Sequence, residues 1–117
     1  MDQPQSLAEI QFTDFLKVGM YAGTIIAVRL NPKAKQPAYI LKIDFGDLGV
    51  KRSSAQLVEN YTSEDLLATQ VIAVLNFPMK RVAGIKSEVL VLATVCEKEG
   101  TILLRPSRGV TNGARVG

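Results

Sequence analysis

Short apolar segments separated by turn residues recur along the chain and predict strands. Between residues 39 and 45 the side chains alternate: Lys42 and Asp44 point to one face, and the other face is apolar, with Tyr39, Leu41, Ile43 and Phe45. This period of two residues is typical of a strand with one buried face. Two further segments, residues 71–75 and 89–92, are continuously apolar and rich in β-branched residues. They predict strands buried on both faces.

The residues between the segments indicate how the strands are connected. Pro32 and Pro106 end two predicted strands, at residues 21–30 and 101–105, because proline cannot donate a hydrogen bond to a sheet. Two glycines make the turn before a strand at residues 50–56. The strands are therefore short and connected mostly by tight turns.

Two short helices and a C-terminal extension complete the predicted fold. Thr13 is placed to cap an N-terminal helix, and Thr62 to open a helix between the third and fourth strands. Short strands with one helix after the third are typical of an OB fold, so we predict an all-β protein with a five-stranded Greek-key barrel. Residues 1–12 predict an N-terminal arm, and residues 13–117 one domain whose C-terminal extension folds back on the barrel.

A basic stretch lies between the two continuous apolar segments. Lys80, Arg81 and Lys86 fall within seven residues that contain no acidic side chain, and Gly84 lies among them. Such a stretch suits an anion or an acidic surface. An OB fold brings its second and third strands and its loops to one face, where a wider set of cations could bind phosphates: Lys33, Lys35, Lys42, Lys51, Arg52, Lys80, Arg81 and Lys86. An ordinary solvated surface is the alternative.

The charge and composition of the chain favour a binding protein over an enzyme. The charged residues before Lys17 are all acidic (three of 11), so the rest of the chain holds 14 basic and 8 acidic residues, a net charge of +6. With no histidine and one cysteine, Cys96, the usual tetrahedral zinc sites and the Ser–His and Cys–His catalytic pairs are excluded. We expect no catalysis and no cofactor. No leader pattern or long apolar stretch is present, so we expect a cytoplasmic protein without membrane insertion.

Several short sequence motifs resemble those of the tRNA-binding-domain family of OB folds, and most closely those of its CsaA-type export chaperones. They are NFP (residues 76–78), the Lys80–Arg81 pair, AGIKSEVLVL (residues 83–92), IDFG (residues 43–46) and KRSSAQL (residues 51–57). The resemblance covers all but about the first dozen residues. In the family this loop contributes to RNA binding, and the resemblance carries that role to Asn76, Lys80, Arg81, Gly84 and Ser87.

The residues after Ser87 separate two functions within the family. RNA binders typically continue with Gln or Glu, Gly and Met, whereas this chain has Glu88, Val89 and Leu90, which follows the CsaA-type pattern. The resemblance therefore implies a chaperone that binds unfolded or preprotein chains and serves the export machinery. A tRNA-binding accessory protein that uses the same basic face is the alternative.

The apolar strands also predict a homodimer. A barrel covers only the inward half of a strand, and the outward halves at residues 71–75 and 89–92 need another cover. A second copy would supply it, with Val74 and Leu90 in the interface. The apolar fraction of 47% is high for a small domain and agrees with association, although a tightly packed core of small residues would also explain it. The CsaA-type relatives are homodimers, so the resemblance implies the same.

Overall fold

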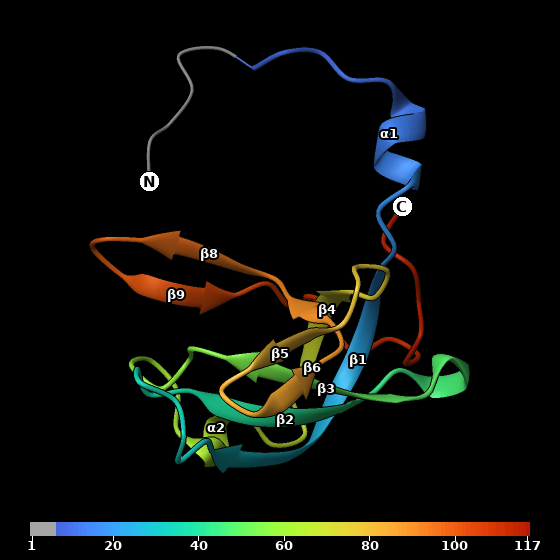
Figure 1. Ribbon diagram of the computed structural model, residues 1–117. Coiled ribbons are helices and arrows are strands. Elements are labelled where there is room, and N and C mark those ends of the chain that lie inside the picture. Colours follow the sequence, from blue (N-terminus) through green and yellow to red (C-terminus); the bar gives the residue numbers. More distant parts are fainter. Residues whose placement is uncertain (1–6) are drawn as a thin grey trace.

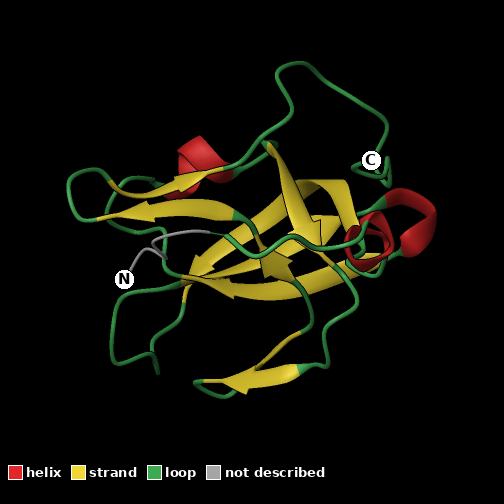
Figure 2. Ribbon diagram, turned by 90° about the horizontal axis from the view of Figure 1, so that it is seen from above, coloured by secondary structure: helices red, strands yellow, loops and turns green. Residues whose placement is uncertain are grey.

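The computed structural model describes residues 7–117, which form an antiparallel sheet of five strands and two hairpins (Figure 1). The strand order in the sheet is β3-β2-β1-β4-β7. Its strands are β1 (Met20–Leu30), β2 (Tyr39–Asp44), β3 (Val50–Ala55), β4 (Gln70–Val74) and β7 (Leu90–Val91). The hairpins are β5 (Lys80–Val82) with β6 (Ile85–Ser87), and β8 (Ala93–Cys96) with β9 (Gly100–Leu103). Both project from the barrel, in different directions (Figure 2).

The sheet curls into a nearly closed barrel because the chain between β6 and β7 returns to β3. The Glu88 amide donates to the Arg52 carbonyl at 2.8 Å. The Ser53 hydroxyl donates to the Val89 carbonyl at 3.2 Å, and the Ser54 amide donates to the Ser87 hydroxyl at 3.1 Å. The predicted all-β barrel of five strands is therefore confirmed.

The core follows the alternation of β2. Tyr39, Leu41, Ile43 and Phe45 are all buried, while Lys42 is exposed. The Phe45 ring also explains Gly23 in β1, because a Cβ at Gly23 would lie 2.6 Å from two atoms of that ring. β1 also contains a bulge between Ile25 and Ala27, where its pairing with β2 shifts by one residue.

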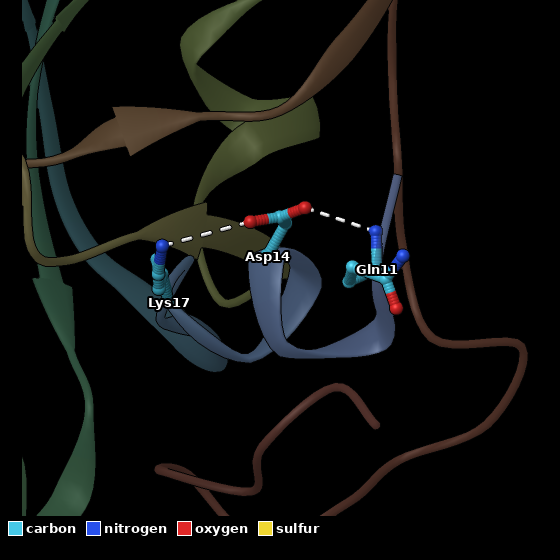
Figure 3. Close-up of polar contacts among 3 residues, drawn as sticks. All are labelled: Gln11, Asp14 and Lys17. Carbon is cyan, nitrogen blue, oxygen red and sulfur yellow. Dashed lines mark hydrogen bonds and ion pairs between the residues drawn. The ribbon is translucent and has the colours of Figure 1, made fainter. Parts of the chain in front are cut away.

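Two short helices flank the sheet. α2 (Ser63–Leu66) begins at Thr62, as predicted: the Thr62 hydroxyl accepts from the Asp65 amide at 3.1 Å, and the Asp65 carboxylate accepts from the Thr62 amide at 2.9 Å. α1 (Phe12–Leu16) is capped from Gln11 instead of Thr13. The Asp14 carboxylate accepts from the Gln11 amide at 2.9 Å and lies 3.5 Å from the Lys17 ammonium (Figure 3).

The N-terminal arm is described only from residue 7, so residues 1–6 of the predicted arm lie outside the described residues. Residues 7–11 are exposed and belong to no helix or strand, and α1 stands outside the barrel at the N-terminal end of β1 (Figure 1). Within residues 7–117, no helix has the length and apolar character needed to cross a membrane.

The C-terminal extension folds back along β1, as predicted. The Gly113 amide donates to the Ala22 carbonyl at 2.8 Å, and the Val116 amide donates to the Met20 carbonyl at 2.9 Å. Since β2 pairs with β1 only from Thr24 onward, the extension takes up the edge of β1 that β2 leaves free.

Candidate functional site

The predicted basic loop is a β-hairpin, and the hairpin divides the loop's residues between two faces. Its turn consists of Ala83 and Gly84, with φ of 46° and 82°, the left-handed pair that a two-residue hairpin turn requires. Lys80 stands opposite Ser87, and Arg81 opposite Lys86. Because side chains alternate along a strand, Arg81 and Lys86 share one face, whereas Lys80 and Ser87 share the other.

The Arg81 side of the hairpin opens on a basic hollow of about 430 Å³, lined by Arg52, Arg81, Gly84, Lys86 and Glu88. A second hollow, of about 180 Å³, lies over β1 and β2 and also includes Arg52, with Arg29 and Lys42 on its wall. The two hollows therefore adjoin each other at Arg52. We call the surface around them the basic face and define it by Arg29, Lys42, Arg52, Arg81 and Lys86.

The basic face contains two cross-strand pairs of like charge. Arg81 stands opposite Lys86, and Lys42 opposite Arg52. Pairs of this kind destabilise a sheet by about 0.2–1 kcal/mol each. In residues 7–117 the one ion pair within 4.0 Å joins Asp14 to Lys17, so no cation of the face is ion-paired within that distance. Glu88 lines the same hollow, and its carboxylate accepts from the Arg52 backbone amide at 3.1 Å, which offsets part of the positive charge. An anion such as a phosphate group would relieve this repulsion.

The structure brings Lys33 to the basic face, places Lys35 in an adjoining hollow and separates Lys51 from the face. A Cβ at Gly84 would lie 3.5 Å from Cδ of Lys33, so this lysine lies at the hairpin tip. Lys35 lines another hollow, formed by Arg29, Leu30 and the loop of residues 31–38, which adjoins the basic face at Arg29. Lys51 stands opposite Ile43, whose side chain points into the core, and therefore lies on the other face of β3 from Arg52.

The other side of the hairpin carries an apolar pocket of about 320 Å³. Its walls are Phe77, Pro78, Lys80, Ser87, Glu88, Val89 and Leu90. Phe77 and Leu90 are 53% and 50% exposed, so two large apolar side chains face solvent together. We call this the apolar pocket. Its polar wall carries both signs of charge, Lys80 and Glu88.

Three residues predicted for binding or for the dimer interface have contacts within the chain. The Asn76 amide group accepts from the Gly19 amide at 2.8 Å and donates to the Lys17 carbonyl at 2.6 Å, so it holds the end of α1. The Ser87 hydroxyl helps to close the barrel on β3. Val74 is only 3% exposed in a single chain, which leaves almost no surface for a partner.

Sequence reasoning did not assign Arg29, Glu88 or Phe77 to a site. Arg29 pairs with Ile40 across β1 and β2, and this register depends on the bulge in β1. No local sequence pattern predicts the bulge. Phe77 lies in the NFP motif of residues 76–78, but the exposure of its side chain depends on the direction in which the hairpin leaves the barrel. The alternation of side chains on either side of the Ala83–Gly84 turn was the sequence signal from which the two faces of the hairpin could have been predicted.

Comparison with known proteins identifies the family. Residues 20–115 match the protein family described as "Putative tRNA binding domain". The chaperone CsaA from Bacillus anthracis is 46% identical, with a TM-score of 0.88 over 94% of this chain and 100% of that chain. The CsaA chaperone from Picrophilus torridus is 42% identical, with a TM-score of 0.86 over 93% and 100% of the two chains.

A second group of relatives shares the domain only as a part. The methionine–tRNA ligase of Thermococcus onnurineus is 34% identical over 107 residues, which are 92% of this chain but 14% of that enzyme. The predicted OB-fold assignment is confirmed by the agreement with the solved CsaA structures over nearly their whole length. The chain belongs to the tRNA-binding-domain family and, within it, to the CsaA type.

Proposed function

We propose that this protein is a non-catalytic, cytoplasmic chaperone that binds unfolded polypeptides, including preproteins before export, in the apolar pocket. The proposal is supported by Phe77 and Leu90, two half-exposed apolar side chains that line one hollow. Clustered apolar side chains at a surface are typical of a binding site. The chaperone name of the CsaA relatives supports the same function.

The chemistry of the pocket fits a client without a fixed sequence. An unfolded chain exposes apolar side chains that a folded protein buries, and their transfer from water into the pocket supplies the binding energy. Lys80 and Glu88 both line the pocket, so a charge of either sign on the client meets an opposite charge. Since apolar burial dominates, client binding should persist at high salt.

The test is the aggregation of a chemically denatured client on dilution into buffer with the chaperone. Phe77→Ser should abolish the suppression of aggregation. Leu67→Ser is the matched control, because Leu67 is also 53% exposed but follows α2, away from the pocket. Equal loss in both variants, or no loss in Phe77→Ser, would show that the client binds elsewhere.

A second candidate function is tRNA binding by the basic face. It is favoured by the two like-charge pairs, Arg81 with Lys86 and Lys42 with Arg52, none of whose side chains has an ion-pair partner within 4.0 Å among residues 7–117. Binding to phosphates releases counterions, so the affinity should fall steeply with salt concentration. A titration with tRNA that shows no salt dependence would exclude this mode.

We also propose that the protein is a homodimer. The arm and α1 also carry exposed apolar side chains, at Leu7, Ile10 and Phe12, and a second copy would cover them. Leu90, which the sequence predicted for the interface, lines the apolar pocket, so we propose the arm and α1 as the interface, whereas Val74→Asp would place a charge in a buried site and unfold the chain. Light scattering across a dilution series should give the dimer mass, and Ile10→Asp should raise the dissociation constant. A monomeric wild type at micromolar concentration would contradict the proposal.

A further inference from the structure

Asn31 is one of the few buried polar side chains of the described residues. It is 7% exposed and directly follows β1. Its side-chain oxygen accepts from the Lys33 amide at 3.0 Å, and its side-chain nitrogen donates to the Ala83 carbonyl at 3.4 Å. The Asn31 backbone amide donates to the Ala38 carbonyl at 2.9 Å, which closes the loop of residues 31–38. One buried side chain thus contacts both its own loop and the tip of the hairpin.

The two segments that Asn31 joins are 52 residues apart in the sequence. Each is an exposed connection with little structure of its own to fix it. The hairpin tip is a two-residue turn, and the loop contains Pro32 and Pro37 but no helix or strand. The contact places the loop against Ala83, and in this arrangement the Lys33 side chain lies beside Gly84.

We propose that Asn31 is a positioning residue, which holds Lys33 at the hairpin tip so that Lys33, Arg81 and Lys86 act together on one anionic ligand. The proposal rests on the proposed binding of tRNA phosphates by the basic face. Lys33 is exposed and has four rotatable side-chain bonds, so an unanchored loop would have to be ordered when the ligand binds. A loop already fixed by Asn31 avoids that entropic cost and contributes its charge at once.

A double-mutant cycle separates positioning from a direct contact. Purified wild type, Asn31→Ala, Lys33→Ala and the double variant are titrated with unmodified tRNA over a range of salt. Asn31→Ala removes no charge, yet it should weaken binding by about fivefold at ~0.15 M salt and flatten the salt slope by about 0.9, the share of one phosphate contact with duplex. Lys33→Ala should do the same, and the double variant should be no weaker than Lys33→Ala.

Two results of the titration would overturn the proposal. One is unchanged affinity and slope in Asn31→Ala, and the other is additive losses in the double variant, which would mean that Asn31 does not act through Lys33. Asn60→Ala is the matched control, since it also removes an asparagine side chain that bonds to a hairpin, here by donating to the carbonyls of Glu99 and Thr101 in the other hairpin. It should leave tRNA affinity unchanged.

A measurement without ligand tests the contact itself. In the free wild type, the side-chain protons of Lys33 should give a nuclear Overhauser effect to the α protons of Gly84. Asn31→Asp keeps the oxygen that accepts from the Lys33 amide but has no N–H for Ala83, so the effect should disappear. Its persistence in Asn31→Asp would overturn the positioning role. Absence of tRNA binding by the wild type would instead refute the proposed RNA function, which this experiment does not use.

Discussion

Arg81→Glu should make the protein more stable and a weaker RNA binder at the same time. Arg81 stands opposite Lys86 on the hairpin, so the substitution replaces a like-charge pair by an opposite-charge pair. The repulsion that is removed and the attraction that is added are each within about 0.2–1 kcal/mol. Both side chains are exposed, and water screens the pair, so we expect a gain in the free energy of unfolding of about 0.5–1 kcal/mol.

Urea denaturation measures that gain, and a thermal melt should show a rise in Tm of about 2–4 °C for a domain of this size. The same variant should bind tRNA at least about fivefold more weakly at ~0.15 M salt, with a salt slope reduced by about 0.9, because one phosphate contact is lost. Stability and affinity thus move in opposite directions. Opposite changes in stability and affinity are expected if the repulsion between Arg81 and Lys86 is relieved by a bound anion.

Lys80→Glu is the matched control. It changes the charge by the same amount one residue away, but Lys80 stands opposite the neutral Ser87, on the side of the apolar pocket. We therefore expect neither the gain in stability nor the reduced salt slope. If Lys80→Glu reproduces both effects of Arg81→Glu, net charge is responsible and the two-faced hairpin is not. If Arg81→Glu is neither more stable nor weaker in binding, the like-charge pair has no functional meaning.

Three further predictions concern the scaffold. Gly23→Ala should destabilise the fold by about 1–3 kcal/mol in urea denaturation, because its Cβ would meet the Phe45 ring at 2.6 Å; an unchanged midpoint would refute this close contact. Asn76→Ala should cost about 1–3 kcal/mol and increase amide exchange in α1, since two backbone groups lose their partner, and it should leave tRNA affinity unchanged, contrary to a binding role. Hydrogen bonds from the Thr62 amide and then the Thr62 side chain lower the pKa of Asp65, so its charge stabilises the fold at neutral pH and this contribution is lost as the pH falls through the lowered pKa. Asp65→Asn should flatten that acid limb of the pH–stability curve, and an identical limb in both proteins would contradict the assignment.

The parts of the fold that depend on local patterns could be predicted from the sequence. The alternation at residues 39–45 correctly separated the buried Phe45 from the exposed Lys42, and the Thr62–Asp65 pair correctly marked the start of α2. These features need only neighbouring residues, whose geometry is fixed by the period of a strand or by a helix cap.

The parts of the site that depend on distant contacts could not be predicted. Asn76 bonds to the end of α1, and Asn31 bonds to the hairpin tip, although nothing near either residue in the sequence indicates its partner. Lys51 and Lys80 were grouped with Arg52 and Arg81 because an OB fold brings its second and third strands and its loops to one face, whereas adjacent strand residues point to opposite faces. Applying the alternation to the basic stretch would have predicted that division.

We propose that one hairpin separates an apolar pocket that binds unfolded polypeptides from a basic face that binds anions. This claim is tested most directly by titrating the purified protein with a denatured preprotein and with tRNA, each at about 50 mM and about 200 mM salt. We predict that preprotein affinity is nearly unchanged between the two salts, while tRNA affinity falls by at least tenfold. Preprotein binding that falls with salt as steeply as tRNA binding would contradict the claim, because it would mean that both ligands bind by charge to the same face.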